Sequence, residues 1–281
     1  MNLKEAFDYA ADLHPAWKGK AGWNPPFCYN RAHALRILGA QKNVKRLTKA
    51  DLAAMRVKLM GEKGHRGKRS AGGVNRIMSM LNTVLKELAD EELIPKYIRL
   101  KPLKENNARE EYFDREDLQK MVESARQDFQ DNELADAIKF AVFTGCRQGE
   151  QLQLEVGDIN LNRSVVTFRD TKNGTNHTLD LHPELVEMLT VRCQGEASTS
   201  KVFDFRNKDD LYYRFCKVRN HLGYSKKLVW HSWRHTTGTW LSEAGADIFV
   251  IAKVLNHKNT STTQRYAKLT DRARKAAINS L

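Results

Sequence analysis

The stretch SVVTFRDTKNGTNHTLDL, residues 164–181, decides the fold class of this chain. Its two ends, 164–168 and 178–181, alternate or run apolar, which is the pattern of a short strand. Between them stands Asn173-Gly174, the dipeptide that favours tight hairpin turns because both residues accept a positive φ. We therefore predict a small antiparallel sheet at this point of the chain.

Helices are predicted on both sides of this hairpin. Asp114 caps one helix, and a second begins near Asn132 and ends at Gly145, since glycine readily takes the left-handed conformation at a helix C-terminus. From Pro183 to the end, the sequence is typical of helices joined by short loops. The second half is expected to be a mainly helical α+β domain with one small antiparallel β-sheet.

The first half predicts a helical domain. Thr48 and Asp51 can form a capping box, so a helix should span 48–60. Residues 74–93 place their apolar side chains at three- and four-residue steps, which predicts an amphipathic helix. The intervening residues 61–73 contain five glycines and four Lys or Arg, which predicts an irregular, solvated loop.

The sequence also predicts where the two domains meet. After Ile94-Pro95, the stretch KYIRLKPLKENNAREEYF is polar, contains Pro102 and lacks a sustained apolar period. We place a linker near 95–112, a helical domain at 1–107 and a second domain at 108–281.

Positive charge is concentrated in the first of these domains. Of the net charge of +13, residues 1–110 carry +11, from 22 Lys or Arg against 11 Asp or Glu. Such asymmetry indicates a polyanionic partner, although charge alone leaves DNA, RNA and an anionic membrane open. The densest run, 41–69, has ten basic residues against two acidic ones. We interpret it as a phosphate-tracking patch, with a merely solvated surface as the alternative; its residues are Lys42, Lys45, Arg46, Lys63, Arg66, Lys68 and Arg69.

Other features restrict the class of protein. No stretch approaches the 18 apolar residues of a membrane helix, and the first residues show no targeting pattern. The four cysteines are far apart without zinc spacing, so we expect free, buried thiols and a cytoplasmic protein. The chain also lacks a P-loop and a carboxylate metal cluster, and we expect neither cofactor nor metal.

Four segments of the second half carry side chains of the types that act in catalysis. They are FTGCRQGEQLQL (143–154), TFRDTKNGT (167–175), HSWRHTTGTWL (231–241) and VLNHKNTSTTQRYAKL (254–269). Each candidate alone is more often structural or solvated, so only their order and context carry weight. The candidates are Arg147, Lys172, His231, Arg234, His257 and Tyr266.

In this order the segments resemble the tyrosine recombinases of the phage integrase family. That family has an arginine after a Thr-Gly turn with an acid three residues on, a hairpin lysine, a His-x-x-Arg pair, and a Leu-Gly-His box nine residues before a tyrosine. The motifs cover roughly residues 110–281, whereas 1–107 resembles the family's helical core-binding domain only in pattern. Two positions depart from the family: Asn256 stands where glycine is usual, and Trp233 where leucine is commoner. Because Asn tolerates the left-handed conformation, we expect Asn256 to take the place of the family's glycine.

The resemblance implies a set of catalytic roles. Arg147 and Arg234 would bridge the nonbridging oxygens of a phosphorane, because guanidinium groups bind paired oxygens well. Tyr266 would attack and leave a 3'-phosphotyrosine; its phenol, with a usual pKa near ~10, requires help that His231, and more weakly His257, could give. Lys172 would protonate the leaving 5'-oxygen.

Four further residues in these segments have supporting or structural interpretations. Glu150 would orient the active-site cations or cap its own helix. We interpret His235, Trp233 and Trp240 as packing residues.

The resemblance also implies partners and assembly. We expect double-stranded DNA with an inverted-repeat core site, bound by a homotetramer that the C-terminal tail AKLTDRARKAAINSL links, in a bacterial, phage or mobile-element host. Clamp-like sequence begins within the first residues and leaves no room for an arm-binding domain, which either a simple recombinase or a shortened chain would explain. The favoured function is a phage-type integrase; a chromosome-dimer resolvase, a type IB topoisomerase and a non-catalytic DNA-binding regulator remain open.

Overall fold

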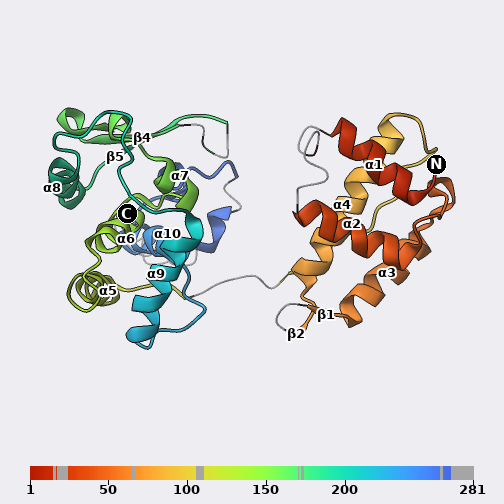
Figure 1. Ribbon diagram of the computed structural model, residues 1–281, viewed down its shortest axis with the longest axis horizontal. Helices are drawn as coiled ribbons and strands as arrows, with labels where there is room; N and C mark the ends of the chain where they lie inside the picture. The colour runs from red at the N-terminus through yellow and green to blue at the C-terminus, as the bar shows by residue number, and fades with distance from the viewer. Residues whose placement is uncertain are drawn as a thin grey trace, which may run out of the picture. The chain divides into compact units, whose positions relative to one another are not determined.

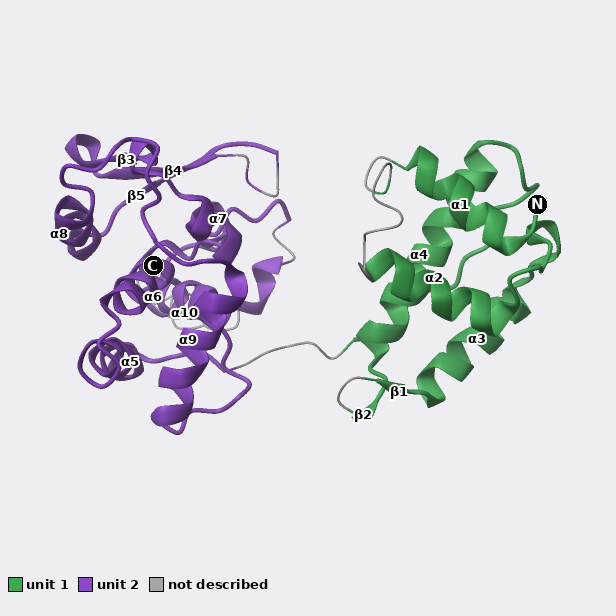
Figure 2. Ribbon diagram, in the orientation of Figure 1, with its two compact units in different colours: residues 1–107 green, residues 108–281 purple. Residues whose placement is uncertain are grey.

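The computed structural model describes residues 1–14, 17, 25–64, 67–105, 111–169, 171, 174–259 and 262–266. The chain divides into two compact units, Met1–Asn107 and Ala108–Leu281, which Figure 2 colours separately. Both are mainly helical and each contains a small antiparallel sheet, so the predicted fold class is confirmed (Figure 1).

Unit 1 is a group of helices packed around α4, which contacts α1, α2 and α3. Residues along one face of α4, among them Ile77, Leu81 and Leu88, are fully buried, as the amphipathic pattern predicted. The described elements of unit 1 are α1 (Leu3–Leu13), α2 (Pro25–Leu38), η1 (Val44–Arg46), α3 (Lys49–Gly61), β1 (Lys63–Gly64), β2 (Gly67–Lys68) and α4 (Ala71–Asp90).

The connection between α3 and α4 differs from the prediction. Thr48 caps α3 through a capping box with Asp51, as expected. The irregular loop predicted for 61–73 is wrong, because β1 and β2 pair as a short antiparallel hairpin and α4 already begins at Ala71. Gly67 has a φ of +104°, a conformation that the glycine-rich sequence permits, and Ser70 caps α4 by accepting the backbone N–H of Gly73.

Unit 2 surrounds α10 with helices and places a three-stranded sheet to one side (Figure 1). Its described helices are α5 (Arg115–Gln127), α6 (Asn132–Thr144), α7 (Gln148–Gln153), η2 (Val156–Asp158), η3 (Leu161–Arg163), α8 (Pro183–Arg192), α9 (Lys208–His221), α10 (Ser232–Glu243) and α11 (Ile248–Val254). Its strands are β3 (Ile159–Asn160), β4 (Val165–Phe168) and β5 (His177–Asp180). Asp114 caps α5 and Gly145 ends α6 with a φ of +63°, as the sequence predicted.

The predicted hairpin is present as β4 and β5, whose register pairs Val166 with Leu179. Around its turn, the Gly174 N–H donates to the Thr171 carbonyl at 2.7 Å, and Gly174 has a positive φ of +74°. The strand β3, which pairs with β4, was not predicted because two residues are too short to show a period. Lys172 lies outside the described residues.

An aromatic stack fixes the start of unit 2 to α10. The rings of Phe113 and Trp233 are stacked with centroids 3.9 Å apart, and both side chains are fully buried. The Phe113 N–H also donates to Thr236 Oγ1 at 3.0 Å. Trp233 and Trp240 both belong to the core, as expected. The residue after the linker is therefore bound directly to the helix that carries Arg234.

The cysteines match the expectation from the sequence only in part. The four cysteines are free, but only Cys146 is buried and Cys28 is exposed, so the expectation that all four are buried is wrong. Cys28 lies in the first turn of α2 on an exposed face, which the spacing of the cysteines alone could not reveal. Across the described residues, no helix has the length and apolar character needed to cross a bilayer, and no cluster of three potential metal ligands occurs.

Replacing Phe113 with alanine tests the importance of the stack. Phe113→Ala should lower the free energy of unfolding of unit 2 by about 3–5 kcal/mol, because a buried aromatic ring is lost and a cavity remains. Val191→Ala is the control, since Val191 is 75% exposed and its truncation should change stability by less than about 0.5 kcal/mol. Urea unfolding of the full chain measures both, and equal effects of the two variants would contradict the assignment.

Candidate active site

The centre of the site is the guanidinium group of Arg234, on α10. Its side chain is buried, with the residue only 4% exposed. Nη1 donates to the Gly145 carbonyl at 2.7 Å, and Nη2 donates to the Leu255 carbonyl. Burial, followed by the neighbouring charge of Arg147, lowers the pKa of Arg234 to about 10. The group therefore stays protonated at neutral pH.

Both acceptors of Arg234 lie at helix C-termini. Gly145 is the C-cap of α6 and Leu255 is the C-cap of α11. The last carbonyls of a helix lack partners within it and carry partial negative charge, so they suit a cation. The two helix ends are in close contact, because a Cβ at Gly145 would lie 2.6 Å from Leu255 Cδ2. A glycine is thus required at position 145 for two reasons: the backbone φ is positive, and a Cβ would overlap the Leu255 side chain.

Arg147 is fixed by Glu150 and by the end of α11. Arg147 Nη1 donates to Glu150 Oε1 at 2.6 Å, while the backbone N–H of Arg147 donates to Glu150 Oε2 at 2.8 Å. Glu150 therefore both orients the cation and caps its own helix, the two roles between which the sequence did not decide. Arg147 Nη2 also donates to the Asn256 carbonyl at 3.2 Å.

Asn256 adopts the left-handed conformation, with a φ of +48°, as expected for the residue in place of the family's glycine. Its carbonyl accepts from Arg147, and its Nδ2 donates to Thr171 Oγ1 at 3.2 Å. Thr171 belongs to the turn of the β4–β5 hairpin. Asn256 therefore joins the hairpin turn to Arg147, and its side-chain contact with Thr171 is one that glycine could not make.

His257 is half-buried beside the two arginines. Its Nδ1 lies 2.9 Å from Thr263 Oγ1. Burial, followed by the charges of Arg234 and Arg147, lowers the pKa of His257 from 6.5 to about 4. At neutral pH its imidazole is neutral, so it contributes one N–H donor and no charge.

Tyr266 lies in a covered position. The residue is 4% exposed and packs with Ile251 and Leu255. Its ring lies against Gly238 of α10, where an added Cβ would approach Tyr266 Cζ to 2.4 Å. Burial raises the pKa of Tyr266, and the charges of Arg265 and Arg234 partly oppose that shift. The phenol is accordingly protonated at neutral pH.

The imidazole in contact with this phenol is that of His235. His235 Nδ1 lies 3.1 Å from the Tyr266 hydroxyl. His231, by contrast, is exposed at the start of α10, and its ring centroid is 5.0 Å from that of His235. Interpreting His235 only as a packing residue therefore missed this contact. Its position one turn after His231 on the same helix face was the available signal.

The structure brings together five of the residues singled out from the sequence. Around the end of α11 lie Arg147, Glu150, Arg234, His257 and Tyr266. His231 is close enough to lower the pKa of His257, although it is the smallest of the stated causes. Lys172, Arg66 and the tail 267–281 lie outside the described residues.

Some side chains of the basic patch predicted in unit 1 have partners within unit 1, and the others are exposed to solvent. Lys42 forms an ion pair with Asp51 at 2.5 Å. The Arg69 side chain is only 8% exposed and contacts Glu62 and the Tyr29 hydroxyl, which favours a structural role. The remaining described members of the patch are exposed: Lys45, Arg46, Lys63 and Lys68.

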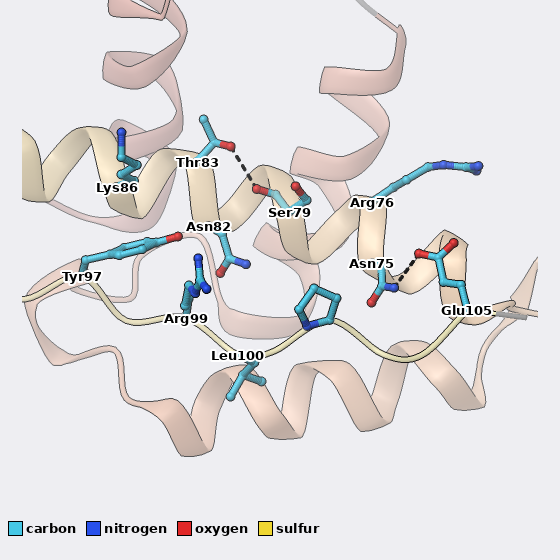
Figure 3. A pocket seen from close by; sticks show the side chains of 11 residues that line it. Asn75, Arg76, Ser79, Asn82, Thr83, Lys86, Tyr97, Arg99, Leu100 and Glu105 are labelled. Carbon is cyan, nitrogen blue, oxygen red and sulfur yellow. Dashed lines mark hydrogen bonds between the residues drawn. The ribbon is translucent and has the colours of Figure 1, made fainter. Parts of the chain in front are cut away.

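A polar cleft of about 500 Å³ lies elsewhere in unit 1, between α4 and the segment after it. Figure 3 shows Asn75 and Asn82 pointing from α4 toward this segment. Asn75 holds the segment in place, donating to the Leu103 carbonyl at 2.9 Å and accepting from the Leu103 N–H at 2.8 Å. Three positively charged side chains line the cleft, and the charge pattern of the sequence did not single them out: Arg76, Lys86 and Arg99.

The lowered pKa of His257 can be tested directly. Its imidazole should titrate with a midpoint near 4 instead of 6.5. Because the unfolded chain takes up this proton at higher pH than the folded one, folded stability should fall as the pH drops from 6.5 to about 4. An NMR titration of imidazole Cε1–H signals measures the midpoint, with His257→Gln identifying the resonance. A midpoint close to 6.5 would contradict the described burial.

The contact between Gly238 and the Tyr266 ring leads to a second prediction. Gly238→Ala should displace the ring, since its Cβ would lie 2.4 Å from Tyr266 Cζ. Nitration of Tyr266 by tetranitromethane, followed by mass spectrometry, should become several-fold faster. Gly149→Ala is the matched control, because its Cβ would meet only the flexible end of Lys208. Equal nitration rates in both variants and the wild type would rule out the packing.

The second half of the chain is similar in sequence to known proteins. A sequence model of the phage integrase family matches residues 111–273. Tyrosine recombinase XerA of Saccharolobus solfataricus is 30% identical over 132 residues, which are 47% of this chain and 44% of that protein. The chain thus spans about half the length of the curated relatives it matches.

Solved structures show the same fold over nearly the whole chain. The Tn1549 transposon integrase in complex with a circular intermediate DNA has a TM-score of 0.75 at 16% identity, covering 99% of both chains. A lambda integrase tetramer bound to a Holliday junction has a TM-score of 0.70 at 18% identity, covering 92% of this chain and 78% of that one. Because the family match extends over more than half of the sequence, the chain belongs to the phage integrase family of tyrosine recombinases.

Proposed function

We propose that this protein is a site-specific DNA recombinase that cuts and rejoins strands through a covalent bond between DNA and Tyr266. The observation that carries the proposal is the pair of guanidinium groups, Arg147 and Arg234, fixed at the end of α11. Tyr266 packs on the same helix through Ile251 and Leu255. A paired cationic site next to a phenol suits nucleophilic attack on a phosphodiester.

Electrostatic stabilisation is the first part of the mechanism. A phosphodiester under attack gains negative charge on its nonbridging oxygens, and preorganised cations lower the energy of that state. Arg234 donates to two backbone carbonyls, which hold the guanidinium group without cancelling its charge. Neutral His257 would add one N–H donor to a phosphate oxygen.

The covalent step follows from the position of Tyr266. Its phenolic oxygen would form a bond to phosphorus while the bond to the 5'-oxygen breaks, giving a 3'-phosphotyrosine. His235, at 3.1 Å from the hydroxyl, is better placed than His231 to receive the phenolic proton. Because the phenol is covered, it must first move away from Gly238, and we assign that movement to DNA binding.

The leaving 5'-oxygen requires a proton. We assign this role to Lys172 because it directly follows Thr171 in the sequence, and Asn256 joins Thr171 to Arg147. In the reverse reaction, a 5'-hydroxyl from another strand would attack the phosphotyrosine and release the phenol. The energy of the original bond is retained, so the exchange needs no ATP.

Unit 1 has features suited to the phosphate backbone of double-stranded DNA. Lys63 and Lys68 face each other across β1 and β2, an arrangement of like charges that costs stability unless an anion lies nearby. Lys45 and Arg46 add exposed positive charge, and Arg76, Lys86 and Arg99 line the cleft beside α4. Phosphate contacts of this kind fix position on DNA and carry no base sequence.

We further propose that four copies act together on an inverted-repeat core site, in a cytoplasmic setting. The lambda integrase of similar fold is a tetramer on a Holliday junction, which supports this assembly. The C-terminal tail, expected to link neighbouring copies, lies outside the described residues. Integration or excision of a mobile element is the favoured biological setting.

A covalent-trapping experiment tests this function. The protein is incubated with suicide substrates made from the DNA that flanks its own gene, without added metal, and denaturant-resistant adducts are measured. The wild type should form an adduct, and Tyr266→Phe should form none because it lacks the nucleophilic oxygen. Tyr213→Phe should match the wild type, since Tyr213 is an exposed residue of α9.

Two further substrates, an intact pair of target sites and a supercoiled plasmid, separate the alternatives. Cleavage restricted to one inverted repeat supports a recombinase, and the products of exchange distinguish an integrase from a dimer resolvase. Relaxation of supercoiled DNA of any sequence would favour a type IB topoisomerase. Tight binding without an adduct on any of these DNAs would contradict the proposal and favour a non-catalytic regulator.

A further inference from the structure

Thr263 is a fully buried residue in direct contact with the active site. Its side chain is 0% exposed, and its Oγ1 lies 2.9 Å from His257 Nδ1. A buried hydroxyl normally has a hydrogen-bond partner, and this imidazole nitrogen provides one. Neither the family motifs quoted above nor the spacing of charged residues singles out this threonine.

The same residue also contacts the backbone of the nucleophile. The Tyr266 N–H donates to the Thr263 carbonyl at 2.9 Å, closing the short turn that ends in the tyrosine. His257 is itself fixed at its backbone, where its N–H donates to the Ala252 carbonyl of α11 at 2.9 Å. Thr263 therefore connects two candidate catalytic residues, one through its side chain and one through its main chain.

The side-chain contact has a chemical consequence. A neutral imidazole carries one proton, and the nitrogen that holds it is decided by the partner of the other nitrogen. If the threonine hydroxyl donates to Nδ1, the proton lies on Nε2, which can then donate to a phosphate oxygen. If the proton lies on Nδ1, the lone pair of Nε2 would instead face an anion.

We propose that Thr263 is a positioning residue: its hydroxyl donates to His257 Nδ1, holds the imidazole in the Nε2–H tautomer, and aligns it with the turn that carries Tyr266. The inference rests on the proposed function, in which His257 donates to the phosphate. It assigns no contact with DNA to Thr263 itself. The burial of His257 among cations makes the tautomer decisive, because a neutral ring has no second N–H to offer.

Two substitutions separate the hydroxyl from the volume of the side chain. Thr263→Val keeps the shape but removes the donor, and Thr263→Ser keeps the donor. In the DNA-free protein, imidazole nitrogen NMR shifts should show the Nε2–H tautomer of His257 for the wild type and Thr263→Ser. Thr263→Val should lose that preference. This measurement requires no enzymatic activity.

Cleavage kinetics supply the second measurement. Single-turnover cleavage of the suicide substrate should be about 3- to 10-fold slower for Thr263→Val, the range expected for one net hydrogen bond, and close to wild type for Thr263→Ser. In a His257→Gln background, Thr263→Val should cause no further loss, because the two residues act as a unit.

The outcomes are distinct. An unchanged tautomer in Thr263→Val, or an equal loss of rate with and without His257, would overturn the proposal and leave Thr263 with a packing role only. If the wild type forms no adduct on any DNA, the proposed function fails, while the tautomer measurement still decides whether Thr263 orients His257.

Discussion

The rest of unit 2 depends on one buried cation held between two helix ends. Arg234 donates to carbonyls at the C-termini of α6 and α11, and so joins helices that are far apart in the sequence. Burying a guanidinium group is costly unless its N–H groups are satisfied. A carboxylate would satisfy them but also neutralise the charge. Carbonyl dipoles satisfy them and leave the positive charge available for a phosphate.

Several local features make this arrangement of Arg234 between two helix ends possible. Gly145 allows the two helix ends to approach, since any Cβ there would overlap Leu255. The stack of Trp233 on Phe113 fixes the face of α10 next to Arg234. The left-handed Asn256 ends α11 so that its carbonyl reaches Arg147. Residues that show nothing unusual when taken singly in the sequence thus together determine the positions of Arg234 and Arg147.

The features that depend on short stretches of sequence could be predicted from the sequence alone. The caps at Thr48, Asp114 and Gly145, and the Asn173-Gly174 hairpin, depend on short-range chemistry, and each was predicted. The contacts of His235 and Thr263 were not predicted, because hydrogen bonds across the fold leave no period in the sequence. The β1–β2 hairpin was missed because its glycines resemble those of an irregular loop. The covered position of Tyr266 depends on the absence of a side chain at Gly238, which spacing cannot indicate.

That covered position bears on how such an enzyme could discriminate between DNA sequences. Under the proposed function, moving the phenol away from His235 and Gly238 would cost the same free energy at every encounter with DNA. A correct sequence can offset that cost through its additional contacts, whereas a chance sequence leaves it in the activation barrier. Fidelity would then be expressed in the rate of strand breakage, so that a molecule bound tightly at the wrong place would leave the genome intact.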